Sequence, residues 1–333
     1  MRKSALLVYA ALIGGGIWFF LQNFQVEGLE GILAKVTVSK KETDPTYNVS
    51  APGPAVAAYQ PGETITIASF NIQVFGQSKL AKPRPMEILA QIVRKFDLVA
   101  IQEIRSSAQD VLPRFIEIIN SSGRTYDYII GPRIGNSSSK EQYAYVFDKQ
   151  TIEIDRRYVY TVQDPDNLLH REPLVAWFRT RGPPADEAFT FTLVNVHTDP
   201  DIVEIELSVM DDIFRVVRDD GRNEDDVIIL GDFNADDRHF GELAQVPGIT
   251  WALSGVKTNT RKTEQYDNLV FHGRATSEFI GRAGVVDFMR EFDLTLDESI
   301  EVSDHLPVWG EFSIFEGRLP ARVAGRPAET ARQ

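Results

Sequence analysis

The segment VIILGDFNAD, residues 227–236, begins with four consecutive branched apolar side chains and ends in polar ones. Such an apolar run predicts a buried β-strand. A carboxylate that closely follows a buried strand, here Asp232, costs free energy unless a partner compensates its charge. The segment therefore predicts a strand that carries Asp232 and Asn234 to a polar site at its end.

Similar strands recur between residues 64 and 315, where they alternate with amphipathic helices. We expect strands at residues 64–70, 97–101, 143–147, 174–178, 189–196, 227–230, 268–271 and 308–315. Apolar residues at helical spacing predict helices over residues 86–96, 111–119 and 202–217. Because this block contains neither an internal repeat nor a long linker, we expect one α/β domain with its helices on the outside.

Many of the expected strands end in, or lie next to, polar residues that could carry chemistry. These residues are Asn71, Glu103, His197, Asp232, Asn234, Asp267, Asp304 and His305. One such ending is ordinary in a capped loop, but the repetition is not expected by chance. The chain has no cysteine, which excludes thiolate catalysis, disulfides and cysteine-bound zinc. The oxygen and imidazole groups that remain predict a pocket suited to Mg²⁺ or Mn²⁺.

The composition limits the class of protein and its partners. A hydrophobic share of 43% and a charged share of 25% exclude disorder throughout the chain. The formal net charge is −13, which excludes a broad basic surface for a polyanion. Any contact with nucleic acid must therefore depend on a few arginines or on bound metal.

The N-terminus differs from the rest of the chain. Arg2 and Lys3 precede an uncharged, largely apolar run over residues 4–21. As a helix this run would extend about 27 Å, close to the roughly 30 Å of a hydrocarbon core. We expect residues 1–24 to be an uncleaved membrane anchor that leaves the catalytic domain outside the cytoplasm, on the periplasmic or extracellular side. A cleaved secretory signal and a buried core helix are the alternatives.

Composition also suggests the limits of the folded domain. Residues 25–62 are expected to form a flexible tether, since the Ala-Pro-Gly-Pro stretch at 51–54 cannot continue a helix. Residues 63–316 are expected to be the catalytic domain. Residues 317–333 contain few apolar side chains and predict a disordered tail.

The order of short motifs along the chain carries a family resemblance. The motifs are ASFNIQVFG, DLVAIQEIRSS, KEQYAYVF, REPLVAWF, VNVHT, GDFNAD, YDNLVF and SDHLPV. Their order and spacing over about residues 64–315 resemble the endonuclease/exonuclease/phosphatase superfamily and, within it, the deoxyribonuclease I-like branch. The resemblance implies a four-layer α/β sandwich of two packed β-sheets flanked by helices. It also implies hydrolysis of phosphodiester bonds with Mg²⁺ as cofactor, or Mn²⁺ in its place.

The resemblance gives roles to three overlapping groups of residues. The metal group offers oxygen ligands: Glu103, Asn71, Asp304 and Asp232. The catalytic group holds two imidazoles, their carboxylate partners and the pair that positions water and phosphate: His197, His305, Glu141, Asp267, Asp232 and Asn234. The substrate-binding group would contact phosphate or the DNA minor groove: Arg105, Arg171, Asn71 and Asn234.

The two imidazoles are expected to have separate carboxylate partners, Glu141 for His197 and Asp267 for His305. A paired carboxylate fixes the tautomer of an imidazole and keeps it basic near neutral pH. Residue types alone do not decide which imidazole is the base. We favour His305 as the base and His197 as the acid.

The two arginines carry alternative interpretations. Arg105 follows Glu103 by two positions, and at the end of the strand we expect its side chain to point away from the metal and along the groove. A solvated Arg105 is the alternative. Arg171 could form an ion pair with Glu172 instead of contacting phosphate.

The sequence also departs from the family pattern. Gln73 stands where the family often has an arginine, and no cysteine can tie down the loops, so we expect weaker affinity for a DNA groove. A structural Ca²⁺ site is only hinted at by Glu172, Asp164 and Asn167. The loop that contains His239 could border the substrate groove.

Three functions follow from these observations. The first is a membrane-tethered, Mg²⁺-dependent DNA endonuclease that faces outward. The second is a phosphodiesterase or phosphatase of the same superfamily that acts on a small or lipid phosphoester, and the third is a non-catalytic binding module. For the first we expect DNA as substrate, the membrane as a partner through the N-terminal segment, and a monomer without a protein partner.

Overall fold

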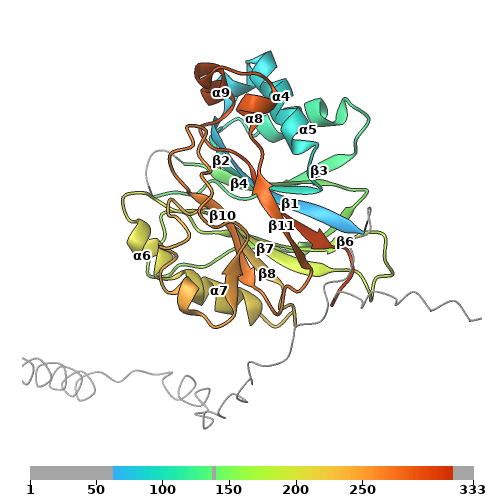
Figure 1. The fold of residues 1–333 in the computed structure, drawn as a ribbon, viewed down its shortest axis with the longest axis vertical. Helices are drawn as coiled ribbons and strands as arrows, with labels where there is room; N and C mark the ends of the chain where they lie inside the picture. Colours follow the sequence, from blue (N-terminus) through green and yellow to red (C-terminus); the bar gives the residue numbers. More distant parts are fainter. Residues whose placement is uncertain (1–62, 137–139, 318–333) are drawn as a thin grey trace, which may run out of the picture. The chain divides into compact units, whose positions relative to one another are not determined.

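The computed structural model describes residues 63–136 and 140–317 (Figure 1). The expected anchor at 1–24 and tether at 25–62, and all of the expected tail beyond Gly317, lie outside the described residues. None of the helices in the described ranges is long and apolar enough to cross a membrane.

The described chain is built on two six-stranded sheets. The first has the order β11-β12-β1-β2-β4-β3, with β11 Phe279–Val285, β12 Val308–Ser313, β1 Thr64–Phe75, β2 Leu98–Ile104, β4 Gln142–Asp148 and β3 Tyr126–Ile130. The second has the order β5-β6-β7-β8-β10-β9, with β5 Ile152–Thr161, β6 Leu174–Thr180, β7 Thr190–His197, β8 Val227–Asp232, β10 Asp267–His272 and β9 Ile249–Trp251.

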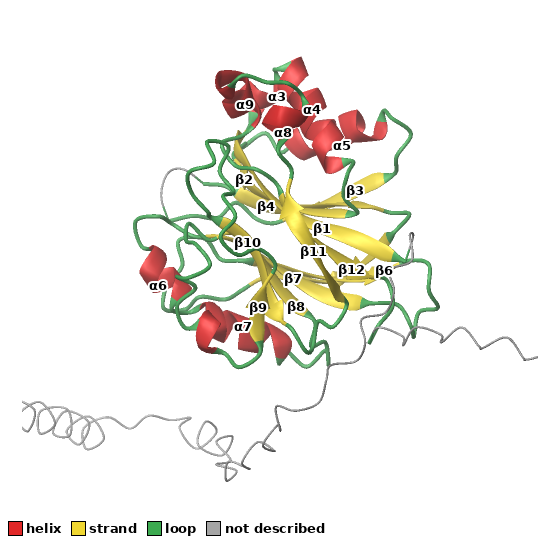
Figure 2. Ribbon diagram, viewed as in Figure 1, coloured by secondary structure: helices red, strands yellow, loops and turns green. Residues whose placement is uncertain are grey.

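Helices cover the outer face of each sheet (Figure 2). The first sheet is covered by α3 Gln77–Leu80, α4 Pro83–Val93, α5 Val111–Asn120, α8 Phe288–Glu291 and α9 Leu296–Val302. The second is covered by α6 Val203–Leu207 and α7 Met210–Arg218, with a 3₁₀ turn at Leu243–Gln245. This arrangement confirms the four-layer α/β sandwich that the family resemblance implies.

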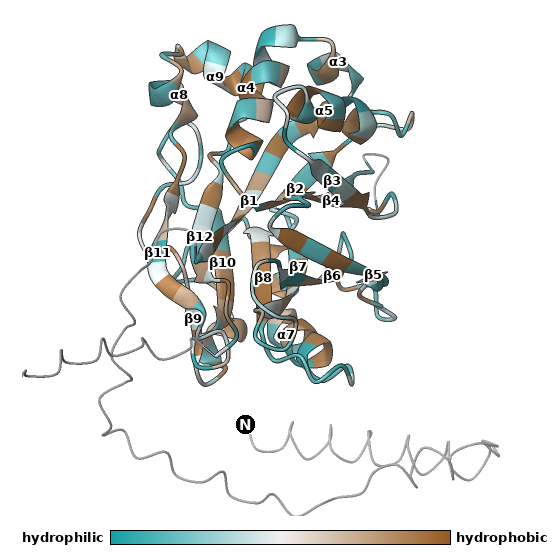
Figure 3. Cartoon of the chain, turned by 90° about the vertical axis from the view of Figure 1, so that its right-hand side faces the viewer, coloured by the Kyte–Doolittle hydropathy of each residue, from teal (hydrophilic) through white to brown (hydrophobic). Residues whose placement is uncertain are grey.

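The apolar core is divided among the three spaces between these layers. Between the two sheets, the stacked rings of Phe178, Phe191, Phe189 and Phe312 form a continuous aromatic row. The hydropathy of the chain in Figure 3 shows the apolar strands β1 and β8 facing each other across this space. Because both sheets bury their inner faces here, the central strands are apolar along most of their length.

The strands that the sequence analysis missed are the four at the sheet edges: β3, β5, β9 and β11. An edge strand is covered less completely, so its sequence lacks a long apolar run. Strand β5, for example, is at most half-buried beyond Ile152. The short helices α3, α8 and α9 were missed too, because fewer than eight residues give little periodicity.

The expected helix over residues 202–217 is wrong, because Ser208 and Val209 separate α6 from α7. Glu206 is 1% exposed and turns inward. Its carboxylate accepts hydrogen bonds at 2.5 Å from the backbone nitrogens of His170 and Asp199. A helix whose buried face holds a carboxylate cannot be placed by apolar spacing alone.

The strand pairing brings the candidate site residues to one edge of the second sheet. Parallel pairing of β7 with β8 puts His197 opposite Asp232, and antiparallel pairing of β8 with β10 puts Asp267 on its other side. Gly231 allows this close approach, since its φ is 153° and a Cβ there would lie 1.9 Å from the carbonyl oxygen of Val196. Glycine is therefore required immediately before Asp232.

Candidate active site

Asp232 lies at the centre of the candidate site, at the end of β8. The residue is 1% exposed. Both imidazoles direct Nε2 towards its Oδ2 atom, His305 at 3.5 Å and His197 at 3.6 Å. Burial raises the pKa of Asp232, but the charges of His305 and His197 outweigh burial, so that this pKa is lowered overall.

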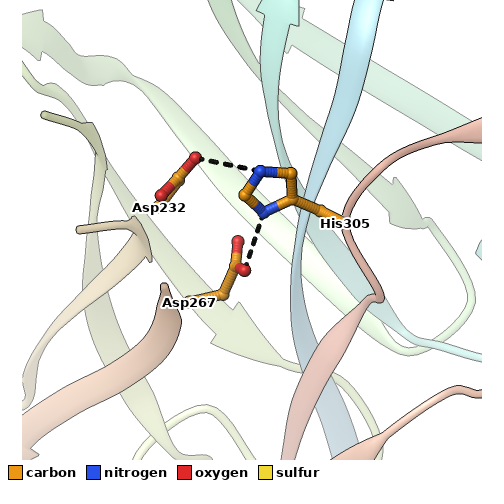
Figure 4. Close-up of side chains that lie close together, drawn as sticks. All are labelled: Asp232, Asp267 and His305. Carbon is orange, nitrogen blue, oxygen red and sulfur yellow. Dashed lines mark hydrogen bonds and ion pairs between the residues drawn. The ribbon is translucent and has the colours of Figure 1, made fainter. Parts of the chain in front are cut away.

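His305 reaches this centre from the loop before β12, and so from the first sheet (Figure 4). Its Nδ1 lies 2.8 Å from Oδ2 of Asp267. Thr258 fixes that carboxylate, because its hydroxyl donates a hydrogen bond of 2.7 Å to Oδ2 of Asp267. Burial lowers the pKa of His305, but the charges of Asp267 and Asp232 outweigh burial and raise it to about 10.

His197 is held in the same way by a different carboxylate. Its Nδ1 lies 2.8 Å from Oε1 of Glu141, which precedes β4 and is 0% exposed. Burial lowers the pKa of His197, but the charge of Glu141 and the hydrogen bond with it raise this pKa overall. Each imidazole is thus held between its own carboxylate and the shared Asp232.

Arg171 supports Glu141 from within the protein. Its Nε lies 3.3 Å from Oε2 of Glu141, and its side chain is 8% exposed. Its Nη1 also donates a hydrogen bond of 3.1 Å to the carbonyl oxygen of His197. The ion pair of Arg171 is therefore with Glu141 and not with Glu172.

The expected direction of Arg105 is wrong. Its Nη2 lies 3.2 Å from Oε2 of Glu103 and 3.4 Å from Oε2 of Glu141, so the guanidinium points into the site. Residues two positions apart along a strand direction project to the same face. Attraction to two carboxylates also favours this direction, with 27% of the side chain still exposed.

Glu103 and Asn71 lie together where β1 and β2 become irregular. Glu103 has a φ of 63°, beside a register shift in β2. Its Oε2 accepts a hydrogen bond of 2.8 Å from the backbone nitrogen of Val74. Nδ2 of Asn71 donates to Oε1 of Glu103 at 3.3 Å and to Oδ2 of Asp232 at 3.0 Å.

The oxygen atoms in this region fit a hard divalent cation. Oδ1 of Asn71 and Oδ1 of Asp304 are buried and have no hydrogen-bond partner. Gln73 donates from Nε2 to Oδ2 of Asp304 over 2.9 Å, and burial raises the pKa of that carboxyl. Unsatisfied buried oxygens beside Glu103 are suitable ligands for Mg²⁺ or Mn²⁺.

Asn234 and a pocket of about 550 Å³ lie beside this centre. The backbone nitrogen of Asn234 donates to Oδ1 of Asp232 at 3.0 Å, and its Nδ2 donates to the carbonyl oxygen of Thr198 at 2.8 Å. The pocket is also lined by Tyr266 and His239, so the His239 loop does border the candidate site.

Two of the residues that hint at a Ca²⁺ site, Asp164 and Asn167, accept hydrogen bonds within the described loops. Oδ2 of Asp164 accepts a hydrogen bond of 2.7 Å from the backbone nitrogen of Leu169. Oδ1 of Asn167 accepts one of 3.2 Å from Nδ2 of Asn136. These contacts account for the two oxygens as ordinary loop hydrogen bonds.

The sequence analysis missed Lys79 and also Thr258, whose hydroxyl holds the carboxylate of Asp267. Lys79 is 7% exposed, and its Nζ donates a hydrogen bond of 2.7 Å to the carbonyl oxygen of Val302. Burial lowers the pKa of Lys79 to about 8, although the charges of Asp304 and Glu103 act in the opposite direction. A lysine in a four-residue helix gives no sequence signal for such a position.

Comparisons with known proteins agree with this geometry. The model of the Endonuclease/Exonuclease/phosphatase family matches residues 68–274. Deoxyribonuclease gamma of Rattus norvegicus is 31% identical over 272 residues, which cover 77% of this chain and 86% of that protein. Deoxyribonuclease-1-like 1 of Cricetulus griseus is 35% identical over 263 residues, covering 75% of this chain and 84% of that protein.

Solved structures support the fold. An endonuclease/exonuclease/phosphatase family protein of Bacteroides thetaiotaomicron superposes with a TM-score of 0.54 at 18% identity, covering 75% of this chain and 98% of that one. A mannosyl-6-phosphatase of the same organism gives a TM-score of 0.51 at 16% identity, covering 74% and 98%. At these identities the likeness is one of fold alone.

Glu141→Gln tests the buried charge cluster. The variant leaves the Arg171 guanidinium and the His197 imidazole buried without their counter-charge, and we expect the free energy of unfolding to fall by about 3 kcal/mol. Because the pKa of His197 is raised in the folded protein, its share of this stability is present below the ordinary value of 6.5 and is lost as the pH rises past the folded-state pKa. The deficit should therefore be larger at about pH 6 than at about pH 9.

Urea unfolding of the full-length protein provides the measurement. Glu153→Gln is the matched control, since Glu153 pairs with Arg179 and Arg181 at the surface. We expect this control to cost less than about 1 kcal/mol. Equal costs for the two variants would show that Glu141 is not the centre of a buried charge cluster.

Proposed function

The chain belongs to the endonuclease/exonuclease/phosphatase family, in its deoxyribonuclease I-like branch, and we propose that it is a metal-dependent endonuclease that hydrolyses phosphodiester bonds in DNA. The observation that carries the proposal is the arrangement of two imidazole–carboxylate pairs that share Asp232. The relatives named deoxyribonuclease, which are matched over most of their length, support DNA as the substrate.

The proposed cation is Mg²⁺, with Mn²⁺ as a substitute. Glu103, Asn71, Asp304 and Asp232 would hold it, and the unsatisfied Oδ1 atoms of Asn71 and Asp304 support this ligand set. When bound, Mg²⁺ supplies positive charge that stabilises the negative charge developing on the phosphoryl oxygens.

The imidazoles are proposed to move the protons. Glu141 and Asp267 each hold an Nδ1 atom, so that both Nε2 atoms are directed to the space around Asp232. One imidazole takes a proton from the attacking water, and the other donates a proton to the leaving oxygen. Burial lowers the pKa of His305, but without a bound cation the charges of Asp267 and Asp232 raise it to about 10, which favours the protonated imidazole. Which imidazole acts as the base and which as the acid therefore depends on how far a bound cation neutralises the charge of Asp232.

Substrate contacts are proposed for Arg105, Arg171 and Asn234. The net charge of −13 leaves no broad positive field, so individual arginines must supply most of the contacts with DNA phosphates. Arg105 is the more accessible of the two, while Arg171 is 8% exposed and mainly orients Glu141 and the end of β7.

Hydrolysis of a small or lipid phosphoester is the second candidate. The same net charge favours it, because a small ester needs no extended basic surface. Its chemistry would use the same imidazoles and ligands, so the two candidates differ only in the substrate.

A membrane tether is proposed for the N-terminal segment. Residues 4–21 form an uncharged, largely apolar run after Arg2 and Lys3, and the positive charges favour a cytoplasmic N-terminus. The catalytic domain would then act outside the cytoplasm on DNA or phosphoesters that reach the cell surface.

Metal removal tests the proposed chemistry. We expect the full-length protein in detergent to nick supercoiled plasmid with Mg²⁺ or Mn²⁺, to lose this activity in EDTA, and to hydrolyse bis-p-nitrophenyl phosphate far more slowly than plasmid. Glu103→Gln should lower nicking at least about 100-fold, whereas Glu117→Gln, a matched change at an exposed position on α5, should not. Full activity in EDTA after extensive dialysis would refute the metal requirement. Activity on the small ester alone would favour the second candidate.

Cell fractionation and external protease test the tether. We expect the full-length protein in the membrane fraction, with its catalytic domain cleaved by protease added to intact cells. A soluble protein that begins near residues 22–30 would favour the cleaved signal instead. Protection of the catalytic domain in intact cells would refute the proposed orientation.

A further inference from the structure

A second cluster of carboxylates lies far from the candidate active site. Asp226 immediately precedes β8, Glu278 precedes β11, and Glu316 follows β12 by three residues. One carboxylate oxygen from each of these residues lies within 4.8 Å of the other two. Asp226 immediately precedes the six-residue strand that ends at Asp232, so about 20 Å separate Asp226 from the catalytic centre.

Two of the three carboxylates are buried, Glu316 is more exposed, and nearby carboxylates add further negative charge. Asp226 is 1% exposed and Glu278 is 0% exposed. Burial and then the charges of Glu278, Glu316 and Glu224 raise the pKa of Asp226 to about 10. Burial, with the charge of Glu316 adding to it, raises the pKa of Glu278 to about 7. Partial burial, and then the charges of Glu224 and its exposed neighbour Asp225, raise the pKa of Glu316.

Several buried polar atoms here have no hydrogen-bond partner. They include Oδ1 of Asp226 and Oε2 of Glu278. The hydroxyl of Thr276 is a third such atom, on a side chain that is 1% exposed and lies beside Asp226. Buried polar atoms normally have a partner, so three buried oxygens without a hydrogen bond in one place indicate a site that can bind a cation.

The backbone already holds one oxygen on each of the two glutamates. Oε1 of Glu278 accepts a hydrogen bond of 2.6 Å from the nitrogen of Gly317, and Oε2 of Glu316 accepts one of 3.0 Å from the nitrogen of Thr190. These bonds fix the carboxylates in place. The orphaned Oε2 atom of Glu278 therefore belongs to a side chain that is already fixed in place.

We propose that Asp226, Glu278 and Glu316, together with the Thr276 hydroxyl, form a second cation site that binds Ca²⁺. All four donors are oxygens, which select hard cations. Oxygens on opposite sides of a Ca²⁺ ion are about 4.6–5.2 Å apart, twice the Ca–O distance, and calcium accepts irregular sets of six to eight ligands. Mg²⁺ requires near-octahedral geometry and keeps several waters, which a site with two of its three carboxylates buried accommodates poorly.

The role of this ion is structural. Asp226 belongs to the second sheet, whereas Glu278 and Glu316 flank strands of the first. A bound Ca²⁺ would therefore join the two sheets at the end of the sandwich opposite to the catalytic centre. It would also neutralise like charges that otherwise repel one another across this junction.

Thermal unfolding of full-length protein freed of metal by chelation tests the site. At about pH 8, saturating Ca²⁺ should raise the unfolding midpoint of the wild type by about 5–10 °C, as expected for binding at about a hundredfold excess over the dissociation constant. Glu103→Gln, which alters the catalytic centre, should keep this response. Glu278→Gln and Glu316→Gln should abolish it, and each should remain folded without the ion because each removes a repelling charge.

Glu187→Gln is the matched control. The carbonyl oxygen of Glu187 accepts a hydrogen bond from the backbone nitrogen of Glu316, but its exposed side chain is not part of the cluster. This variant should respond to Ca²⁺ like the wild type. Calorimetric titration with Ca²⁺ should show one binding event fewer in Glu278→Gln than in the wild type. The proposal is overturned if Glu278→Gln and Glu316→Gln respond like the wild type, if Glu103→Gln alone loses the response, or if Mg²⁺ stabilises the protein and Ca²⁺ does not.

Discussion

The carboxylate of Asp232 is the constraint on which the rest of the candidate site depends. It is buried at the end of β8, where an uncompensated charge would be costly. Nε2 atoms of two imidazoles and the amide of Asn71 surround it. Each imidazole then needs a carboxylate of its own on Nδ1, and a glycine must precede Asp232 so that β7 and β8 can approach. One buried charge thus determines much of the local sequence.

The sequence predicted the central strands of both sheets, because strands covered on both faces carry uninterrupted apolar runs. It missed the edge strands, of which β5 is an example, since partial burial leaves no such run. In the site, residues at strand ends were identified because each follows or precedes an apolar segment. The direction of Arg105 was predicted wrongly, and Lys79 was not found, because both depend on contacts between segments distant in the chain.

The two ends of β8 carry carboxylates with different proposed roles. Asp232 at its end takes part in the proposed catalysis, and Asp226 before its start belongs to the proposed calcium site. Both ends join the two sheets, since His305 and Glu278 come from the first sheet and β8 from the second. A buried carboxylate at a sheet junction is stabilised by a positive partner. At Asp232 the partners are two imidazoles, and at Asp226 the proposed partner is Ca²⁺.

The central claim is that both imidazoles work as one unit around Asp232, and a double-mutant cycle on plasmid nicking tests it most directly. His197→Ala and His305→Ala should each lower the turnover number by about 10²–10⁴-fold in protein that is still folded. The double variant should lose far less than the product of the two single losses, because either change already disables the shared centre. Losses that multiply, or single variants within about threefold of the wild type, would contradict the account.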